Sequence, residues 1–223
     1  MIKKINVMGI ELDNYSSREA MMLVETFLNN TVLNTIEEVP LQVLVQAKEN
    51  EDVRQSIRAL DLAIPGDREI LVEAGYGNSR QINDVEENSF FHEFIRRVIR
   101  NKKKVFLLGE TQAVVDELTT VLKEDYERLQ IIGSCCLERF KDDAGVINEI
   151  NSQAPDVILS ALPSPKQELF ILEQKGRLHA KIWYGMNNNV RIRKGKERLI
   201  QMIRTMVGRV IFRHQILKYQ RKE

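Results

Sequence analysis

The chain has 223 residues, of which 43% are hydrophobic and 29% are charged, and these ordinary values exclude a wholly disordered protein. No apolar run approaches the roughly 20 residues that span a bilayer, and no secretory signal is visible at the N-terminus. The net charge of +1 conceals an asymmetry, because residues 190–223 carry +9 and the preceding residues carry −8. A basic segment of this kind attracts phosphates or anionic lipid.

Short β-rich segments alternate with amphipathic stretches. Strands are predicted at 5–10, 41–45, 62–64, 104–109, 129–133, 156–161 and 180–185. Helices are predicted after Ser16 or Ser17, after Asn50, over 90–99, after Thr111, over 144–150 and from near Lys166. Strands joined by helical crossovers indicate an α/β fold, a Rossmann-like, doubly wound, mostly parallel sheet. We expect this domain over residues 1–189 and a basic helical appendage over residues 190–223.

Gly109 and Glu110 lie between a buried strand and a helix, at the edge of the sheet where such folds bind ligands. The amides at the start of that helix could bind a phosphate, although a plain tight turn is the alternative. The segment has neither a dinucleotide-binding nor a P-loop motif.

Residues 164–168 form a second candidate segment at a predicted strand end: Ser164, Pro165, Lys166, Gln167 and Glu168. Proline suits the first position of a helix, which places the next three residues in its first turn. The Gln167 amide can both donate and accept, which suits the edge of a uracil-like base or a sugar amide. The alternative is a solvated helix start in which Glu168 interacts favourably with the helix dipole.

Four segments, residues 5–14, 105–109, 155–158 and 164–168, occur in the order found in the WecB/TagA/CpsF glycosyltransferases, and the chain resembles that family over essentially its whole length. The resemblance implies transfer of N-acetylmannosamine or a similar hexosamine from a UDP donor to a polyprenyl-diphosphate-linked acceptor. It implies no metal and no cofactor, and a place in cell-envelope polysaccharide synthesis such as that of teichoic acid. The candidate substrate-binding residues in the body of the chain are Gly109, Glu110, Ser164, Lys166, Gln167 and Glu168.

The motifs that line the active site in that family are altered. Its Thr-x-Asn motif has no equivalent near residues 38–40, and its Pro-Asp-Gly motif reads Pro65-Gly66-Asp67. Asp67 is the remaining candidate for the general base, and capping of a helix that begins near Arg68 is its alternative role. The alternative function is that of a catalytically inactive family member, which binds a nucleotide sugar or serves as a partner subunit.

The basic tail carries apolar residues at three- and four-residue spacing, flanked by arginines. Such a helix can bind an anionic membrane surface, with about 1 kcal/mol from each cation. Packing on its own domain, or on a second copy in a homo-oligomer, is the alternative. The resemblance implies that Arg204, Arg209 and Arg213 contact the diphosphate. Nucleic acid is not expected as a partner, because aromatic residues make up 6% of the chain and no stacking motif accompanies the tail.

The two cysteines, Cys135 and Cys136, are adjacent in the sequence. Neighbouring cysteines seldom form a useful disulfide, and two thiols alone do not make a zinc site. A reducing, cytoplasmic location is therefore expected. The basic tail and the family resemblance imply in addition that the protein is peripheral on the inner face of the membrane.

Overall fold

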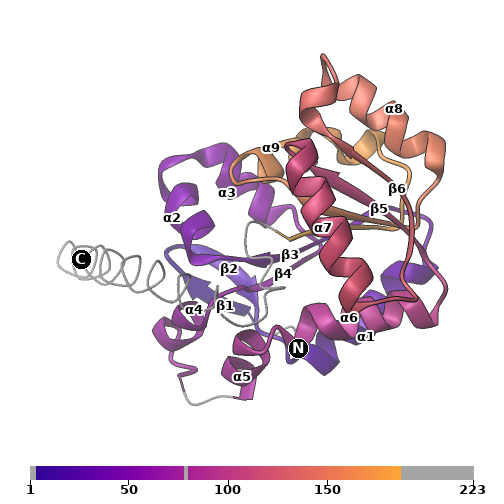
Figure 1. Ribbon diagram of the computed structural model, residues 1–223. Helices are drawn as coiled ribbons and strands as arrows, with labels where there is room; N and C mark the ends of the chain where they lie inside the picture. The colour runs from indigo at the N-terminus through magenta and orange to yellow at the C-terminus, as the bar shows by residue number, and fades with distance from the viewer. Residues whose placement is uncertain (1–3, 78–79, 187–223) are drawn as a thin grey trace. The chain divides into compact units, whose positions relative to one another are not determined.

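A computed structural model describes residues 4–77 and 80–186 of the chain (Figure 1). Within these residues, six strands form one sheet in the order β4-β3-β8-β7-β5-β6, and each hydrogen-bonded pair is parallel. The strands are β3 (Asn34–Val39), β4 (Leu62–Pro65), β5 (Lys104–Gly109), β6 (Gln130–Cys136), β7 (Val157–Ala161) and β8 (Ile182–Gly185). The predicted α/β class with a doubly wound parallel sheet is confirmed.

Helices cover both faces of this sheet. They are α1 (Ser17–Asn29), α2 (Leu41–Glu49), α3 (Glu51–Arg58), α4 (Arg68–Glu73), α5 (Arg80–Glu86), α6 (Ser89–Arg100), α7 (Gln112–Asp125), α8 (Asp143–Gln153) and α9 (Lys166–Gln174), with short 3-10 turns η1 (Leu137–Arg139) and η2 (Lys175–Arg177). Ser16, Asn50 and Thr111 cap α1, α3 and α7 with their side chains, as predicted. Successive residues of β8 point to opposite faces: Trp183 stacks on Phe170 of α9, and Tyr184 packs against α6.

The first predicted strand is instead an antiparallel hairpin, β1 (Lys4–Val7) and β2 (Ile10–Asp13), separate from the main sheet. Met8 and Gly9 form its two-residue turn with φ values of 55° and 78°, and the primed turns of short hairpins need positive φ. The Asp13 carboxylate accepts a hydrogen bond of 2.9 Å from the backbone N–H of Ala63 in β4 and pairs with Lys4 at 2.7 Å.

The strand predicted at 41–45 is also wrong, because these residues begin helix α2. Val43, Leu44 and Ala47 are buried on one side of that helix, and Pro40 occupies its N-cap position. A short apolar run does not distinguish a buried strand from a helix. The neighbouring strand is β3, which contains Glu37 and Glu38 and therefore lacks an obvious strand pattern.

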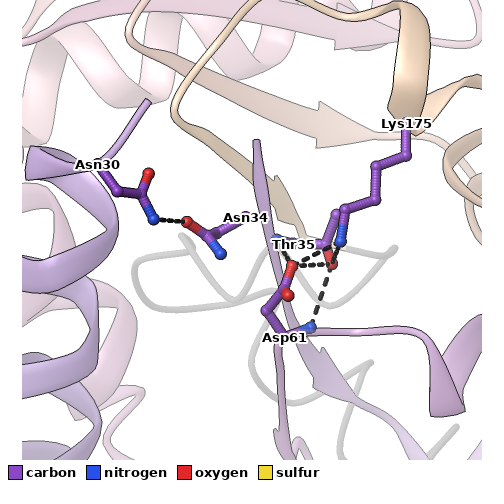
Figure 2. Close-up of polar contacts among 5 residues, drawn as sticks. All are labelled: Asn30, Asn34, Thr35, Asp61 and Lys175. Atoms are coloured by element: carbon purple, nitrogen blue, oxygen red, sulfur yellow. Dashed lines mark hydrogen bonds and ion pairs between the residues drawn. The ribbon is translucent and has the colours of Figure 1, made fainter. Parts of the chain in front are cut away.

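A polar cluster joins η2 to the amino ends of β3 and β4 (Figure 2). Asp61 Oδ2 accepts hydrogen bonds from the Thr35 backbone N–H at 2.7 Å, the Thr35 hydroxyl at 2.9 Å and Lys175 Nζ at 2.7 Å. Burial alone would raise the pKa of Asp61, but the Lys175 ammonium and the Thr35 donors outweigh it and hold the pKa below its ordinary value. Asn30 and Asn34 are bonded to each other beside the cluster.

Cys135 and Cys136 are free and buried at the end of β6. Burial raises the pKa of the Cys135 thiol to about 12 and also raises that of Cys136. Because the thiolate is the reactive form, this environment suits a packing role.

The predicted boundary at residue 189 and the arginines Arg204, Arg209 and Arg213 lie outside the described residues. None of the helices within residues 4–77 and 80–186 is long and apolar enough to cross a membrane.

Candidate functional site

The carboxyl ends of the parallel strands bring two polar side chains and a glycine into one row. Glu37 of β3 is in register with Gly185 of β8, which is in register with Ser160 of β7. All three positions lie at the edge of the sheet where α/β folds bind ligands. We take these three residues as the part of the candidate site that the sheet contributes.

Because Gly185 has no side chain, the side chains of Gln167 and Glu37 can both lie close to its backbone. A Cβ atom at position 185 would lie 2.7 Å from Gln167 Nε2 and 3.2 Å from Glu37 Oε2. Distances below 3 Å are not tolerated without movement, so a larger residue would displace the Gln167 amide. The absence of a side chain at Gly185 therefore leaves room for the Gln167 amide and the Glu37 carboxyl group.

Gln167 and Glu168 lie in the first turn of α9 and are 0% and 1% exposed. The alternative of a solvated helix start is therefore wrong for both residues. Neither amide atom of Gln167 has a hydrogen-bond partner among the described residues. An unsatisfied buried amide is costly, so this side chain retains the capacity to bind a ligand or a water molecule.

The carboxyl group of Glu168 has an unusual environment. Burial raises its pKa, and smaller opposing contributions come from the Ser164 hydroxyl and the Glu37 side chain. Glu37, which contributes to this environment, is itself a buried carboxyl group that is 1% exposed. The sequence analysis did not single out Glu37, because its placement depends on strand register.

The remaining predicted residues of the body lie at the end of β5 and at the start of α9. Lys166 Nζ pairs with Glu110, which links the start of α9 to the end of β5. The Ser164 hydroxyl bonds to Gln46 Oε1 of α2. A Cβ at Gly109 would lie 2.8 Å from Val115 Cγ2, which gives this glycine a packing reason in a tight turn. The structure thus brings Glu110 and Lys166 together.

Asp67 occupies a separate position after β4. Its Oδ2 accepts a hydrogen bond of 2.7 Å from the backbone N–H of Leu41, the first residue of α2. Asp67 is the N-cap residue of α4 by position, but its side chain makes no capping bond there. The expected alternative, capping of the helix that begins at Arg68, is therefore corrected: the carboxylate caps α2, where it also interacts favourably with the helix dipole.

A small pocket, partly open to solvent, lies beside the carboxyl ends of β3 and β4. Its walls come from the start of α1 and from α4, α5 and α6, and it is lined by Asn14, Tyr15, Ser17, Ala20, Glu38, Ile64, Pro65, Leu71, Gln81, Asp84, Val85 and Phe90. Glu38 accepts a hydrogen bond from the Tyr184 hydroxyl, and Asp84 accepts one from the Ser17 hydroxyl at 3.0 Å. Sequence patterns did not identify this pocket, because its lining comes from segments that are far apart in the chain.

The described residues contain no group of three or more His, Cys, Asp or Glu side chains that could hold a metal ion. The polar side chains at this edge are an amide, hydroxyls and carboxyl groups, which form hydrogen bonds and exchange protons.

The parallel sheet and its polar carboxyl edge are those of a Rossmann-like α/β protein. The chain belongs to the glycosyl transferase WecG/TagA/CpsF family, whose sequence profile matches residues 5–198. It is similar to N-acetylglucosaminyldiphosphoundecaprenol N-acetyl-beta-D-mannosaminyltransferases of Staphylococcus aureus strains NCTC 8325 / PS 47, COL and MRSA252. Each is 22% identical over 201 residues, which cover 87% of this chain and 77% of the relative.

Proposed function

We propose that this protein is a glycosyltransferase that moves N-acetylmannosamine or a similar hexosamine from a UDP donor to a polyprenyl-diphosphate-linked acceptor. The observation that carries the proposal is the buried Gln167 amide at the carboxyl edge of the sheet, with both polar atoms unused within the described residues. The family membership and the activity in the relatives' names support the same reaction.

In this proposal, Gln167 recognises the base or the sugar amide by donating and accepting hydrogen bonds. Gly109, Glu110, Ser164, Lys166 and Glu168 border the donor site. Asp67 is the general base that accepts the proton of the acceptor hydroxyl. Arg204, Arg209 and Arg213 in the basic tail bind the diphosphate, and the tail holds the protein at the inner face of the membrane.

A second candidate function is that of an inactive family member that binds a nucleotide sugar. Two observations favour it, and both concern the turn after β4. The Asp67 carboxylate is bonded to the amide of Leu41. A Cβ at Gly66, where the related Pro-Asp-Gly motif has its aspartate, would lie 2.7 Å from the Glu38 carbonyl oxygen.

Replacement of Gln167 by alanine is expected to weaken binding of UDP-N-acetylglucosamine about tenfold or more, because a pair of hydrogen bonds is lost. Isothermal titration calorimetry measures the effect. Gln130→Ala, at an exposed position at the start of β6, is the matched control and should bind as the parent protein does. Equal affinity of the Gln167→Ala variant and the parent would contradict the assigned role of Gln167.

The Asp67→Asn variant separates the two candidate functions. Asparagine keeps an oxygen that can accept from Leu41 but cannot accept a proton, so we expect turnover to fall about a hundredfold with unchanged donor affinity. The assay uses UDP-N-acetylmannosamine and a prenyl-diphosphate-linked N-acetylglucosamine, with the exposed Asp125→Asn as control. Donor binding without turnover in the parent protein would favour the inactive-binder function. Absence of donor binding would refute both.

A further inference from the structure

A serine hydroxyl is buried beside the Gln167 amide at the carboxyl edge of the sheet. Ser160 of β7 is in register with Gly185 of β8, and neighbouring strands lie about 4.8 Å apart. A Cβ atom at Gly185 would lie 2.7 Å from Gln167 Nε2. Ser160 and the Gln167 amide therefore flank the same position of β8.

Both side chains belong to the layer between the sheet and α9. Side chains alternate along a strand, so Ser160 points to the same side as Ile158, two residues before it. Ile158 lies in an apolar cluster with Trp183 and with Phe170 of α9. Gln167 is three residues before Phe170 and so lies on the same side of α9. The two polar groups are therefore at the carboxyl end of an otherwise apolar layer.

The fold does not use the Ser160 hydroxyl. Ser160 is 0% exposed, and its Oγ has no hydrogen-bond partner in the part of the chain that the structure describes. Both polar atoms of the Gln167 side chain are in the same state. A buried hydroxyl without a partner lowers the stability of a fold, and alanine would occupy nearly the same space without this cost. Costly features of this kind are typical of functional sites.

The unused atoms define the chemical group that satisfies them. Gln167 Oε1 accepts a hydrogen bond, Gln167 Nε2 donates, and the Ser160 hydroxyl can do either. A phosphate diester has no donor for Gln167 Oε1, and burying its charge between two neutral side chains is costly. The edge of an amide or imide offers an N–H beside a C=O and therefore matches both side chains.

We propose that Ser160 is a further binding residue of the donor site, where its hydroxyl and the Gln167 amide together bind one amide or imide edge of the nucleotide sugar. This inference rests on the proposed function. Uracil has such an edge in its ring, and an N-acetylated sugar has one in its acetamido group. Because both side chains are fully buried, we expect the start of α9 to move as the group enters. The partly exposed pair of Lys166 and Glu110 joins that segment to the end of β5, and such pairs open at little cost.

Ser160→Ala is expected to weaken binding of UDP-N-acetylglucosamine about five- to tenfold, the effect of one lost hydrogen bond, as measured by calorimetry. The urea midpoint of unfolding should be unchanged or higher, because the variant loses a hydroxyl that the fold does not use. Ser56→Ala is the matched control. Ser56 is 2% exposed, and its hydroxyl donates a hydrogen bond of 2.8 Å to the Val53 carbonyl oxygen. This control should be less stable than the parent protein and should bind as the parent does.

Three ligands identify the source of the bound edge. Equal losses of affinity for UDP, UDP-glucose and UDP-N-acetylglucosamine in Ser160→Ala would assign it to uracil. A loss confined to UDP-N-acetylglucosamine would assign it to the acetamido group. Unchanged affinity for all three ligands would overturn the inference and leave the donor site standing. Absence of binding by the parent protein would refute the donor site itself.

A double-mutant cycle tests whether the two side chains bind the same group. If they do, the variant with both Ser160→Ala and Gln167→Ala should lose less affinity than the product of the two single losses, because either change alone already disturbs the shared group. Losses that simply multiply would show that the two side chains act independently and would contradict the inference.

Discussion

Alanine at position 66 is expected to destabilise the fold by about 3 kcal/mol, the upper part of the range for overpacked sites. The new Cβ would lie 2.7 Å from the Glu38 carbonyl oxygen and 3.0 Å from the carbonyl carbon of Val39. These atoms are backbone of β3, the strand that pairs with β4, so they cannot move aside without disturbing the sheet. Urea denaturation of the parent and the variant measures the difference.

Gly176→Ala is the matched control, because nothing lies within 4 Å of a Cβ at that glycine. A loss below about 0.5 kcal/mol at Gly66, the range for ordinary surface substitutions, would show that the turn adapts easily. From the same contact we expect that exchanging the side chains at positions 66 and 67, which gives the order Pro-Asp-Gly, is also destabilising. An aspartate at position 66 would need a different backbone between β4 and α4.

Replacement of Asp61 by alanine is expected to lower the free energy of unfolding by about 3 kcal/mol near neutral pH. The carboxylate accepts hydrogen bonds from Lys175 and from two donors of Thr35, and bonds to charged groups each contribute about 1.5–3 kcal/mol. The change leaves the Lys175 ammonium and the Thr35 backbone N–H without this acceptor. Denaturant unfolding followed by circular dichroism measures the loss, with Asp52→Ala at an exposed position of α3 as control.

The difference between the parent and Asp61→Ala should also depend on pH. The folded-state pKa of Asp61 is lowered, so the ionised carboxylate stabilises the fold above its unfolded-state pKa. That stabilisation decreases as pH falls through the folded-state pKa. We therefore expect the two unfolding free energies to converge in acid. A difference that stays constant from neutral to acid pH would contradict the assigned role of the carboxylate.

The sequence predicts those parts of the fold that depend on local signals. Glycine closes the buried strand β5, and side-chain caps begin α1, α3 and α7, so these elements are predicted at nearly their observed positions. The hairpin at the N-terminus and helix α2 were predicted wrongly. In the first case two central residues with positive φ reverse the chain, and in the second a short apolar run fits either structure.

The site was predictable only in part, for a related reason. The motif at 164–168 could be placed at a strand end because its proline and its polar residues are consecutive. The approach of Glu37 to Gly185 depends on the register of β3 against β8, and the bond from Leu41 to Asp67 joins residues that are 26 positions apart. Contacts of this kind are set by the tertiary structure and leave no local pattern.

The N-terminal hairpin has a consequence for the edge of the main sheet. β4 is the outermost strand at one end of the sheet order, and β2 packs alongside it. Exposed outer strands recruit strands from other molecules, because their backbone donors and acceptors are unsatisfied. The Asp13 carboxylate accepts a hydrogen bond from the Ala63 N–H, so this donor of β4 is not available to a strand from another molecule.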